Sequence, residues 1–254
     1  MTKPCPTVVL LVGLIVVGSF SLAGTILAEK TSPDLRHFWR FDTDKPGQPP
    51  AGFSVVMLGE GQAANWKVEA DPQTPSAPNR LAQSTPCPAA SSQTPSACLQ
   101  LLLVDGDLYE YPDLTVRLRF APKDAQSGSG GGAAGMVFKA EKDARNFYAA
   151  IVDPVAGVLD VVRVVNGQVT ALGREPVKLK PVMWHTLRVQ HNTILSKDFL
   201  EISFDGQIVF THWDKKLGAG QIGLVTTSGA PIWFDNFDAV QLFSQRPLSP
   251  PAAY

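Results

Sequence analysis

Short runs of alternating apolar and polar residues, separated by turn residues, make up most of the chain. In Leu114–Phe120, for example, every second residue is apolar. Because successive side chains of a β-strand point to opposite faces, this period of two predicts a strand with one buried face. Further strands are predicted at Phe53–Val56, Trp66–Glu69, Leu99–Val104, Gly135–Lys139, Asn146–Asp153, Trp184–Gln190, Gln221–Thr226 and Ile232–Phe243.

Two turn sequences each separate a pair of strand-forming runs. They are Asn166–Gly167, between Leu159–Val165 and Val169–Leu172, and Asp205–Gly206, between Leu200–Phe204 and Ile208–Phe210. Two-residue hairpin loops need positive φ angles, which Asn, Asp and Gly adopt most readily. Many short strands with such turns, and no convincing amphipathic helix after the N-terminal segment, predict an all-β fold of sandwich or barrel type.

Two stretches interrupt the strand pattern. Asp71–Ala97 is rich in Pro, Ser, Thr and Ala, which predicts an excursion over the surface. Gln126–Gly132 contains only Gln, Ser and Gly, which predicts a flexible loop. The core is predicted to contain Met136 or Val137, Phe138, Trp184, Leu187, Val189, Ile222, Leu224 and Phe234, with His185 at the edge of the opposite face.

The N-terminus carries the clearest local signal. Lys3 is followed by the uncharged apolar run Thr7–Gly18, and then by small residues at Ser21–Ala23 and Ala28. A positive charge, an apolar segment and small residues in this order are typical of a cleaved secretory signal peptide. Alternatively, Thr7–Ala28 is long enough to remain as a transmembrane anchor.

Both alternatives divide the chain in the same way: residues 1–28 as signal peptide or membrane anchor, 36–243 as one β domain, and 244–254 as a flexible tail. The domain is then secreted, periplasmic or anchored outside the cytoplasm, and the membrane is contacted only through the N-terminal segment. In an exported chain, the isolated pair Cys87 and Cys98 predicts a disulfide that closes a small loop.

Composition supports a folded domain and argues against one class of partner. Hydrophobic residues make up 44% and charged residues 18% of the 254 residues, which is enough for a sizeable core. The formal net charge of −1 offers no basic surface, so nucleic acid is not an expected partner.

Five sequence patterns follow one another in a characteristic order. They are Gly135–Lys139 with Asp143–Tyr148, the Trp-His-x-Leu-x-Val strand at Trp184–Val189, the Asp-Gly hairpin at Phe204–Gln207, Gly220–Leu224, and Phe234–Phe237. Together they resemble the concanavalin A-like lectin/glucanase family, including its LamG-like jelly rolls, over about Phe38 to Leu242. The resemblance implies a two-sheet antiparallel β-sandwich. It indicates a fold rather than an activity.

The same pattern is similar to a bacterial family of formerly unknown function that includes 3-keto-disaccharide hydrolases. Members with that activity carry an acidic stretch of the form Gly-x-Glu-x-Gln-x-x-Asp. The corresponding segment here, Asn146–Asp153, contains neither Glu nor Gln. A glycoside hydrolase of the 3-keto-disaccharide type is therefore an alternative whose catalytic residues are unknown.

Other catalytic arrangements find little support in the sequence. A retaining glycosidase needs two carboxylates about 5 Å apart, which on this fold would appear as Glu-x-Asp-x-x-Glu along one strand. No such run occurs, and Glu201 is the only acid on its strand. His191 and His212 lack neighbouring carboxylates at metal-binding spacings. The sequence therefore favours a protein without catalytic activity.

Aromatic side chains are the better candidates for ligand binding, because a sugar ring can stack on an exposed aromatic ring. The candidates are Trp213, Trp233, Tyr109 and Tyr111. Calcium-binding relatives of this fold use acidic residues near both ends of the domain. By that resemblance, Asp42 and Asp235 are candidates for a structural Ca²⁺ site if the terminal strands pair, and no other cofactor is expected.

These observations predict an exported, non-catalytic β-sandwich module that binds a glycan or another cell-surface component. The hydrolase is one alternative, and a structural domain of the cell envelope is another. Exposed aromatic rings would favour binding, and convergent carboxylates or histidines in a cleft would favour an enzyme. A surface with neither feature would favour the structural role.

Overall fold

The computed structural model describes residues 35–59, 64–85, 98–122, 132–180, 182–194, 197–227 and 231–242. Within these ranges the chain forms fifteen strands and no helix, so nothing there could cross a membrane as a helix. The strands are β1 (Arg36–Trp39), β2 (Phe53–Leu58), β3 (Trp66–Ala70), β4 (Asn79–Gln83), β5 (Leu99–Val104), β6 (Pro112–Phe120), β7 (Ala134–Ala140), β8 (Phe147–Asp153), β9 (Val158–Val165), β10 (Gln168–Pro176), β11 (His185–Ile194), β12 (Lys197–Phe204), β13 (Gln207–Trp213), β14 (Gln221–Thr226) and β15 (Ile232–Gln241).

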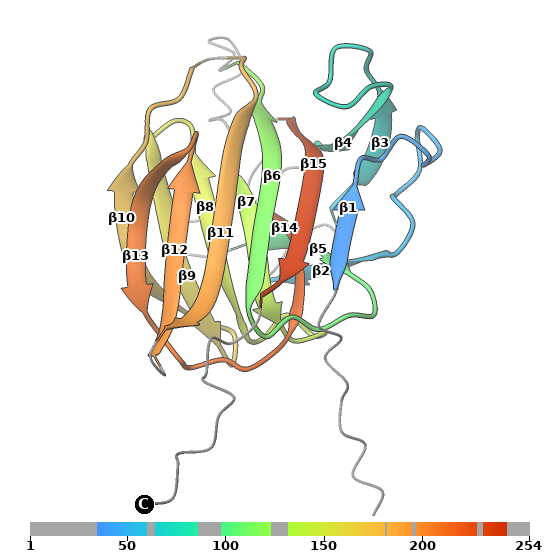
Figure 1. The fold of residues 1–254 in the computed structure, drawn as a ribbon. Helices are drawn as coiled ribbons and strands as arrows, with labels where there is room; N and C mark the ends of the chain where they lie inside the picture. The colour runs from blue at the N-terminus through green and yellow to red at the C-terminus, as the bar shows by residue number, and fades with distance from the viewer. Residues whose placement is uncertain are drawn as a thin grey trace, which may run out of the picture. The chain divides into compact units, whose positions relative to one another are not determined.

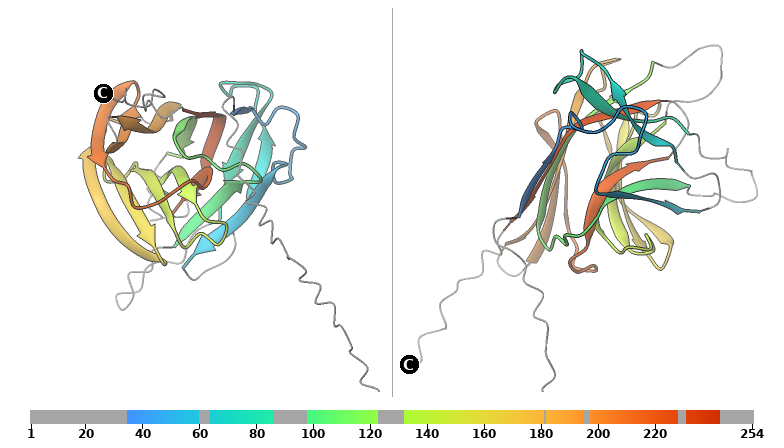
Figure 2. Two further views of the ribbon diagram at one scale, coloured as in Figure 1. Left: turned by 60° about the horizontal axis from the view of Figure 1, so that its bottom comes forward. Right: turned by 90° about the vertical axis from the view of Figure 1, so that its right-hand side faces the viewer.

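The strands form two antiparallel sheets. The first sheet, which faces the viewer in Figure 1, has the order β13-β12-β11-β6-β15-β4-β3, and β1 also pairs with β15. The second sheet has the order β10-β9-β8-β7-β14-β5-β2. Figure 2 shows the sheets as two packed layers. The predicted all-β, two-sheet sandwich is therefore confirmed, and the strands at the two ends of the domain do pair.

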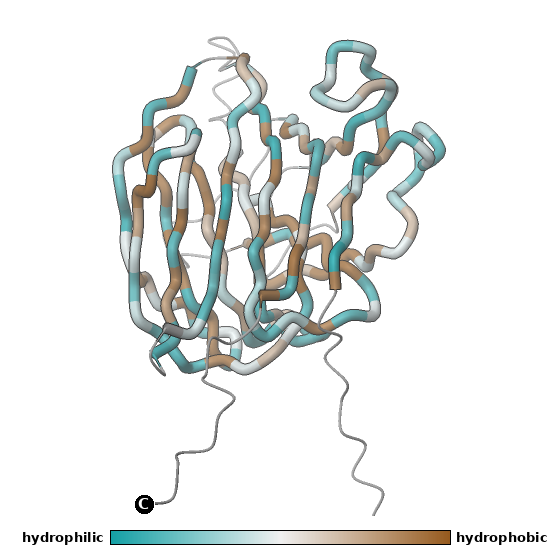
Figure 3. Tube along the Cα trace, in the orientation of Figure 1, coloured by the Kyte–Doolittle hydropathy of each residue, from teal (hydrophilic) through white to brown (hydrophobic). Residues whose placement is uncertain are grey.

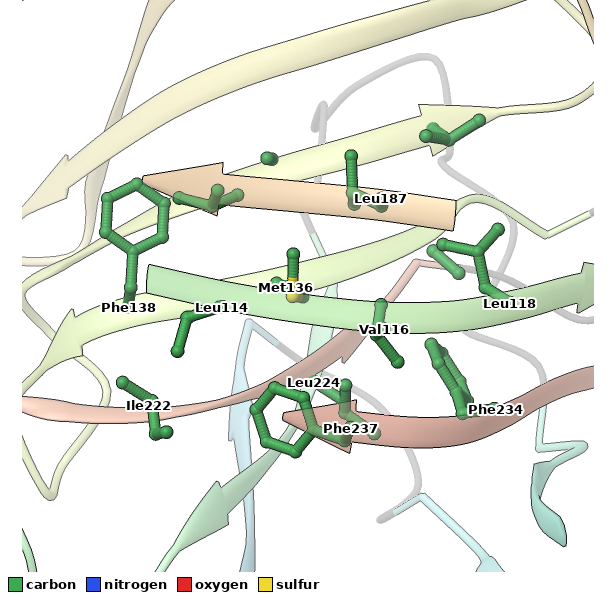
Figure 4. Close-up of a cluster of buried hydrophobic side chains, with 14 of the residues drawn as sticks. Leu114, Val116, Leu118, Met136, Phe138, Leu187, Ile222, Leu224, Phe234 and Phe237 are labelled. Carbon is green, nitrogen blue, oxygen red and sulfur yellow. The ribbon is translucent and has the colours of Figure 1, made fainter. Parts of the chain in front are cut away.

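The core lies between the sheets and is built from alternate residues of facing strands (Figure 4). β6 contributes Leu114, Val116 and Leu118, while Met136 and Phe138 come from β7 in the other sheet, and all five are fully buried. Burying a side chain of this kind contributes about 1.5–3 kcal/mol. The predicted core residues that belong to this cluster are Met136, Phe138, Leu187, Val189, Ile222, Leu224 and Phe234.

The two sheets differ in the chemistry of their outer faces. Strands of the first sheet alternate between apolar and polar residues, as the colours in Figure 3 show. In the second sheet, Leu101, Val137, Phe147 and Val225 form a second buried apolar cluster on the face turned away from the core. Near-continuous apolar runs such as Leu99–Val104, which Gln100 alone interrupts, are the sequence sign of a strand buried on both faces.

The two predicted hairpins are confirmed. Asn166 and Gly167 have φ angles of 52° and 78°, and Asp205 and Gly206 have φ angles of 48° and 78°. Positive φ at both central residues is the signature of the tight turn whose twist matches that of the flanking strands. These turns set the registers of β9 with β10 and of β12 with β13.

The prediction that Asp71–Ala97 is a surface excursion is wrong for its central part. Asn79–Gln83 forms β4, which lies between β3 and β15 in the first sheet. Leu81 is fully buried and pairs with Phe234. The strand is short and has only one large apolar residue. An alternation of apolar and polar residues therefore cannot be recognised among the surrounding Pro and Ser residues.

The predicted orientations of Trp184 and His185 are also wrong. Every second side chain of a strand points to the same face. Because Leu187 and Val189 are buried, His185 must also face inwards. His185 is indeed 2% exposed, whereas Trp184 precedes the strand and is only half-buried. Strand parity therefore places His185, and not Trp184, in the interior.

Several predictions lie outside the described residues. These are the signal peptide or anchor at 1–28, Cys87 of the proposed disulfide, most of the loop Gln126–Gly132, and the tail 244–254. Cys98 is described and is buried. The disulfide stays a prediction.

Both ends of the described domain lie at the same end of the sandwich. The backbone N–H of Gln241 donates to the carbonyl oxygen of Leu35 over 2.9 Å. In Figure 1 this is the lower end, where β1 begins and β15 finishes. We call it the terminal end, and the opposite one the distal end.

Candidate functional site

A pair of neighbouring aromatic rings lies on the outer face of the first sheet, at the edge formed by β12 and β13. Phe199 and Trp213 are directly opposite each other in the strand register. Their ring centroids are 4.9 Å apart with an interplanar angle of 54°. Trp213 is 53% exposed, because the alternate residues Leu200 and Ile202 point into the core and turn this face outwards. We call the pair the aromatic platform.

A row of polar residues runs beside the platform across four neighbouring strands. The row consists of Thr211, Glu201, Gln190 and Asp113, which are cross-strand partners on β13, β12, β11 and β6. Arg188 donates two hydrogen bonds to Asp113, over 2.8 and 2.7 Å, and fixes that carboxylate. The platform therefore has carboxylate, amide and hydroxyl groups next to its apolar rings. We call these residues the polar row.

Trp233 lies on the same outer face and packs against two guanidinium groups, whereas Trp213 has one ammonium group, that of Lys197, at 5.7 Å from its ring centroid. The guanidinium carbon of Arg80 is 4.4 Å from the Trp233 ring centroid, and that of Arg119 is 5.5 Å away. The indole Nε1 donates to Glu69 Oε2 over 3.3 Å. These cation–π contacts hold β4, β6 and β15 together and occupy a face on which a sugar would have to stack.

The structure places Tyr109 and Tyr111 in the interior, where neither ring can serve as an exposed stacking surface. Tyr109 is fully buried and Tyr111 is 5% exposed. The Tyr109 hydroxyl hydrogen-bonds His37 Nδ1 over 2.9 Å. Burial, followed by the charge of Asp107, raises the pKa of Tyr109 well above its ordinary value. Tyrosine occurs both buried and exposed, so the residue type alone could not predict that these two side chains are buried.

The two candidate calcium ligands contact different parts of the segment around the start of β4. Asp235 is fully buried and accepts hydrogen bonds of 2.7 Å from Thr74 Oγ1, from the backbone N–H and the hydroxyl of Ser76, and from the backbone N–H of Asn236. Asp42 contacts Asn79, whose side-chain amide donates to the Asp42 carbonyl oxygen over 3.2 Å.

Asp235 thus fixes the loop that leads into β4. Both of its carboxylate oxygens accept hydrogen bonds from N–H and O–H groups of the protein. Within the described ranges no group of three or more His, Cys, Asp or Glu side chains could hold a metal ion. The calcium site stays a prediction that none of these contacts supports.

A buried polar cluster that the sequence did not reveal lies near the terminal end of the sandwich. Lys139 is 3% exposed and donates to the carbonyl oxygen of Leu217 over 3.3 Å. His191 is 1% exposed and its Nε2 lies 3.3 Å from the carbonyl oxygen of Asp214. The carboxylate of Asp214 accepts from Tyr148 Oη over 2.6 Å and pairs with an arginine, Arg163.

Burial shifts both basic groups of this cluster strongly. It lowers the pKa of Lys139 to about 8, although nearby carboxylates oppose the shift. Burial, and after it the charge of Lys139, lowers the pKa of His191 to about 4. Perturbed pKa values often mark functional sites. Here the side chains are enclosed by protein, so a structural role fits them better than contact with a ligand.

Lys139 could not be placed from the sequence because strict alternation predicts it on the outer face of β7. A β-bulge between β7 and β14 breaks that alternation, and Lys139 adopts a positive φ of 51°. The extra residue in a bulge redirects the side chains around it. Lys139 thus follows Phe138 into the interior instead of facing away from it.

Comparison with known proteins identifies the fold. No protein-family profile matches the sequence, and no curated protein sequence matches it either. Among solved structures, carbohydrate-binding module CBM66 from Bacillus subtilis is similar with a TM-score of 0.54 and 17% identity, over 75% of this chain and 96% of that one. A β-glucanase from Bacillus licheniformis has a TM-score of 0.51 and 12% identity, over 84% and 100% of the two chains.

A third similar structure is the carbohydrate recognition domain of Emp46p in a potassium-bound form. Its TM-score is 0.51 at 10% identity, and the match covers 76% of this chain and 90% of that one. At such identities the likeness establishes the fold alone. The domain is a β-sandwich of the concanavalin A-like jelly-roll type.

Proposed function

We propose that this domain is an exported, non-catalytic carbohydrate-binding module whose ligand stacks on the aromatic platform. The observation that carries the proposal is the 53% exposed ring of Trp213, which has Phe199 at its side and the polar row next to it. Two of the similar structures are a carbohydrate-binding module and a carbohydrate recognition domain, which supports the proposal.

The chemistry of the platform suits a sugar. A pyranose or furanose ring presents an apolar C–H face that can pack on the Trp213 indole, and hydroxyl groups around its edge. Glu201 accepts hydrogen bonds, while Gln190 both donates and accepts them. The side chains are partly solvated and the surface is open, so we expect affinities of about 0.1–1 mM, equivalent to about 4–5.5 kcal/mol.

A glycan array followed by titration of the best ligand tests the proposal. Trp213→Ala should weaken binding at least fivefold, about 1 kcal/mol, without changing the melting temperature. Phe38→Ala is the matched control, because Phe38 is an aromatic residue 57% exposed on β1, away from the platform. Equal loss in both variants, or an array without any bound glycan, would contradict the proposal.

The same purified domain also tests the absence of catalysis. We expect no product from a 3-keto-disaccharide or from a β-glucan after long incubation. Turnover of either substrate would overturn the non-catalytic assignment, and turnover of the 3-keto-disaccharide would favour the hydrolase alternative.

Export rests on the N-terminal segment and is tested separately. A precursor that becomes shorter by about 28 residues, measured by mass spectrometry of the exported protein, would support a signal peptide. An intact chain in the membrane fraction would support the anchor instead. Recovery of the intact chain from the cytosol would refute export.

A further inference from the structure

An apolar pocket opens at the distal end of the sandwich, separate from the aromatic platform. Gln241 pairs with Pro112 at the start of β6, and the pocket lies at the other end of that strand, beside Phe120. Its volume is about 230 Å³. Its lining is mostly apolar and includes Phe120, Val155, Val182 and Met183, together with Lys180 and His185.

The mouth of the pocket exposes apolar side chains that a free surface would normally bury. Val155 is 50% exposed, Val182 47% and Met183 54%. The described chain exposes eight large hydrophobic side chains, and these three surround one opening. A gathering of apolar residues around a concavity is typical of a binding site, whereas isolated exposed residues are not.

The floor of the pocket is fixed by contacts of His185. Its Nδ1 lies 2.7 Å from Asp205 Oδ2, and its Nε2 lies 3.1 Å from the carbonyl oxygen of Lys180. The imidazole also stacks on the ring of Phe204 at a centroid distance of 5.2 Å. Both ring nitrogens thus have partners, and the ring can present its apolar surface to a ligand. The pocket is therefore preformed.

The residues that line the pocket include one lysine, Lys180, and no carboxylate. Lys180 is exposed and forms no ion pair with any residue in the described ranges. The acids next to these residues do not line the pocket: Asp153 accepts hydrogen bonds from the backbone N–H groups of Val155 and Ala156, and Asp205 contacts His185. The flexible stem of Lys180 allows its ammonium group to reach a charge held at the mouth.

The volume limits the size of the apolar group. An engineered protein cavity of about 150 Å³ binds benzene, which has six carbons, so about 230 Å³ accommodates roughly eight or nine carbons by proportion. We propose that this pocket binds a medium-chain alkyl carboxylate, with its chain among Val155, Met183 and Phe120 and its carboxylate at Lys180.

Titration calorimetry with sodium octanoate, 1-octanol and sodium acetate tests this site. We expect octanoate to bind at least threefold more tightly than octanol, and acetate not to bind. The ring signals of His185 in a histidine-labelled NMR sample should shift with octanoate. Octanoate that does not bind below about 10 mM would overturn the proposal, and equal affinities for octanoate and octanol would overturn its carboxylate part.

Variants locate the binding. Val155→Asp and Met183→Glu each place a carboxylate at the mouth and should weaken octanoate at least tenfold. Lys180→Gln should reduce octanoate to the affinity of octanol and leave octanol unchanged. Ile208→Asp is the matched control, since Ile208 is 60% exposed but does not line the pocket. Octanoate binding that tolerates both Val155→Asp and Met183→Glu would show that the ligand binds elsewhere.

Discussion

Lys139 and His191 place two basic groups inside a core that is otherwise mostly apolar. Both groups lose solvation on folding, so both are held more easily in the neutral form. Their effects fall in different pH ranges, because the pKa of His191 is lowered to about 4 and that of Lys139 to about 8. The pH dependence of stability can therefore test each residue separately.

His191 should make the domain sensitive to mild acid. Its folded-state pKa of about 4 lies below the unfolded value of about 6.5, so between these values the unfolded chain binds more protons. Stability is then complete above pH 6.5 and is lost as the pH falls towards 4, by about 2–3 kcal/mol. Urea unfolding at pH 7.5 and 4.5 should show a smaller difference in His191→Gln than in wild type. His212→Gln, which removes a half-buried histidine on the edge strand β13, is the control and should keep the wild-type difference.

Lys139 should affect stability in the alkaline range. At neutral pH its buried positive charge destabilises the folded domain, whereas the neutral His191 does not. The unfolded lysine has a pKa of about 10.4, so between pH 8 and 10.4 the unfolded chain binds more protons, and stability rises with pH. The rise due to Lys139 is at most about 3 kcal/mol. Lys139→Met should remove it, which melting temperatures at pH 7.5 and 10 would reveal. Retention of the full rise in this variant would mean that another group titrates.

At the scale of elements, β4 is the clearest difference between sequence and structure. It joins β3 to β15, and Leu81 carries its packing against Phe234. A strand with one large apolar residue gives too few repeats for its period to be recognised. The contacts that stabilise it, from Arg80 to Trp233 and from Ser76 to Asp235, connect residues far apart in the sequence.

If β4 belongs to the core, Leu81→Ala should destabilise the domain by about 2–5 kcal/mol, because it removes a fully buried side chain and leaves a cavity. A surface excursion would lose less than about 0.5 kcal/mol. Chemical denaturation measures the difference directly. Val55→Ala, at a position 41% exposed on β2, provides the control and should stay close to wild type.

The longer strands and the hairpins were predictable because their signals are local. The alternation in Leu114–Phe120 and the Asn-Gly and Asp-Gly turns depend only on residues that are adjacent in the sequence. Only one of the two residues of the aromatic platform could be predicted. Trp213 could be nominated by residue type, whereas Phe199 joins it through a cross-strand register that no single segment encodes. The same limit concealed the burial of Tyr109 and the inward turn of Lys139.

At the scale of the whole molecule, the proposed binding surfaces are distributed over different parts of the sandwich. The aromatic platform is on the outer face of the first sheet, and the apolar pocket is at the distal end. The terminal end holds the first and last residues of the described domain and the buried Lys139 cluster. If the chain is tethered through its N-terminus, the tether joins the domain at Leu35, which lies at the terminal end.

The backbone hydrogen bond between Gln241 and Leu35 has a consequence for protein engineering. A domain whose first and last strands meet can be inserted into a surface loop of a host protein through two short linkers, without stretching either partner. The domain can also be circularly permuted. A short linker would join these two ends, and new termini at the Asp205–Gly206 turn would leave every strand of both sheets intact.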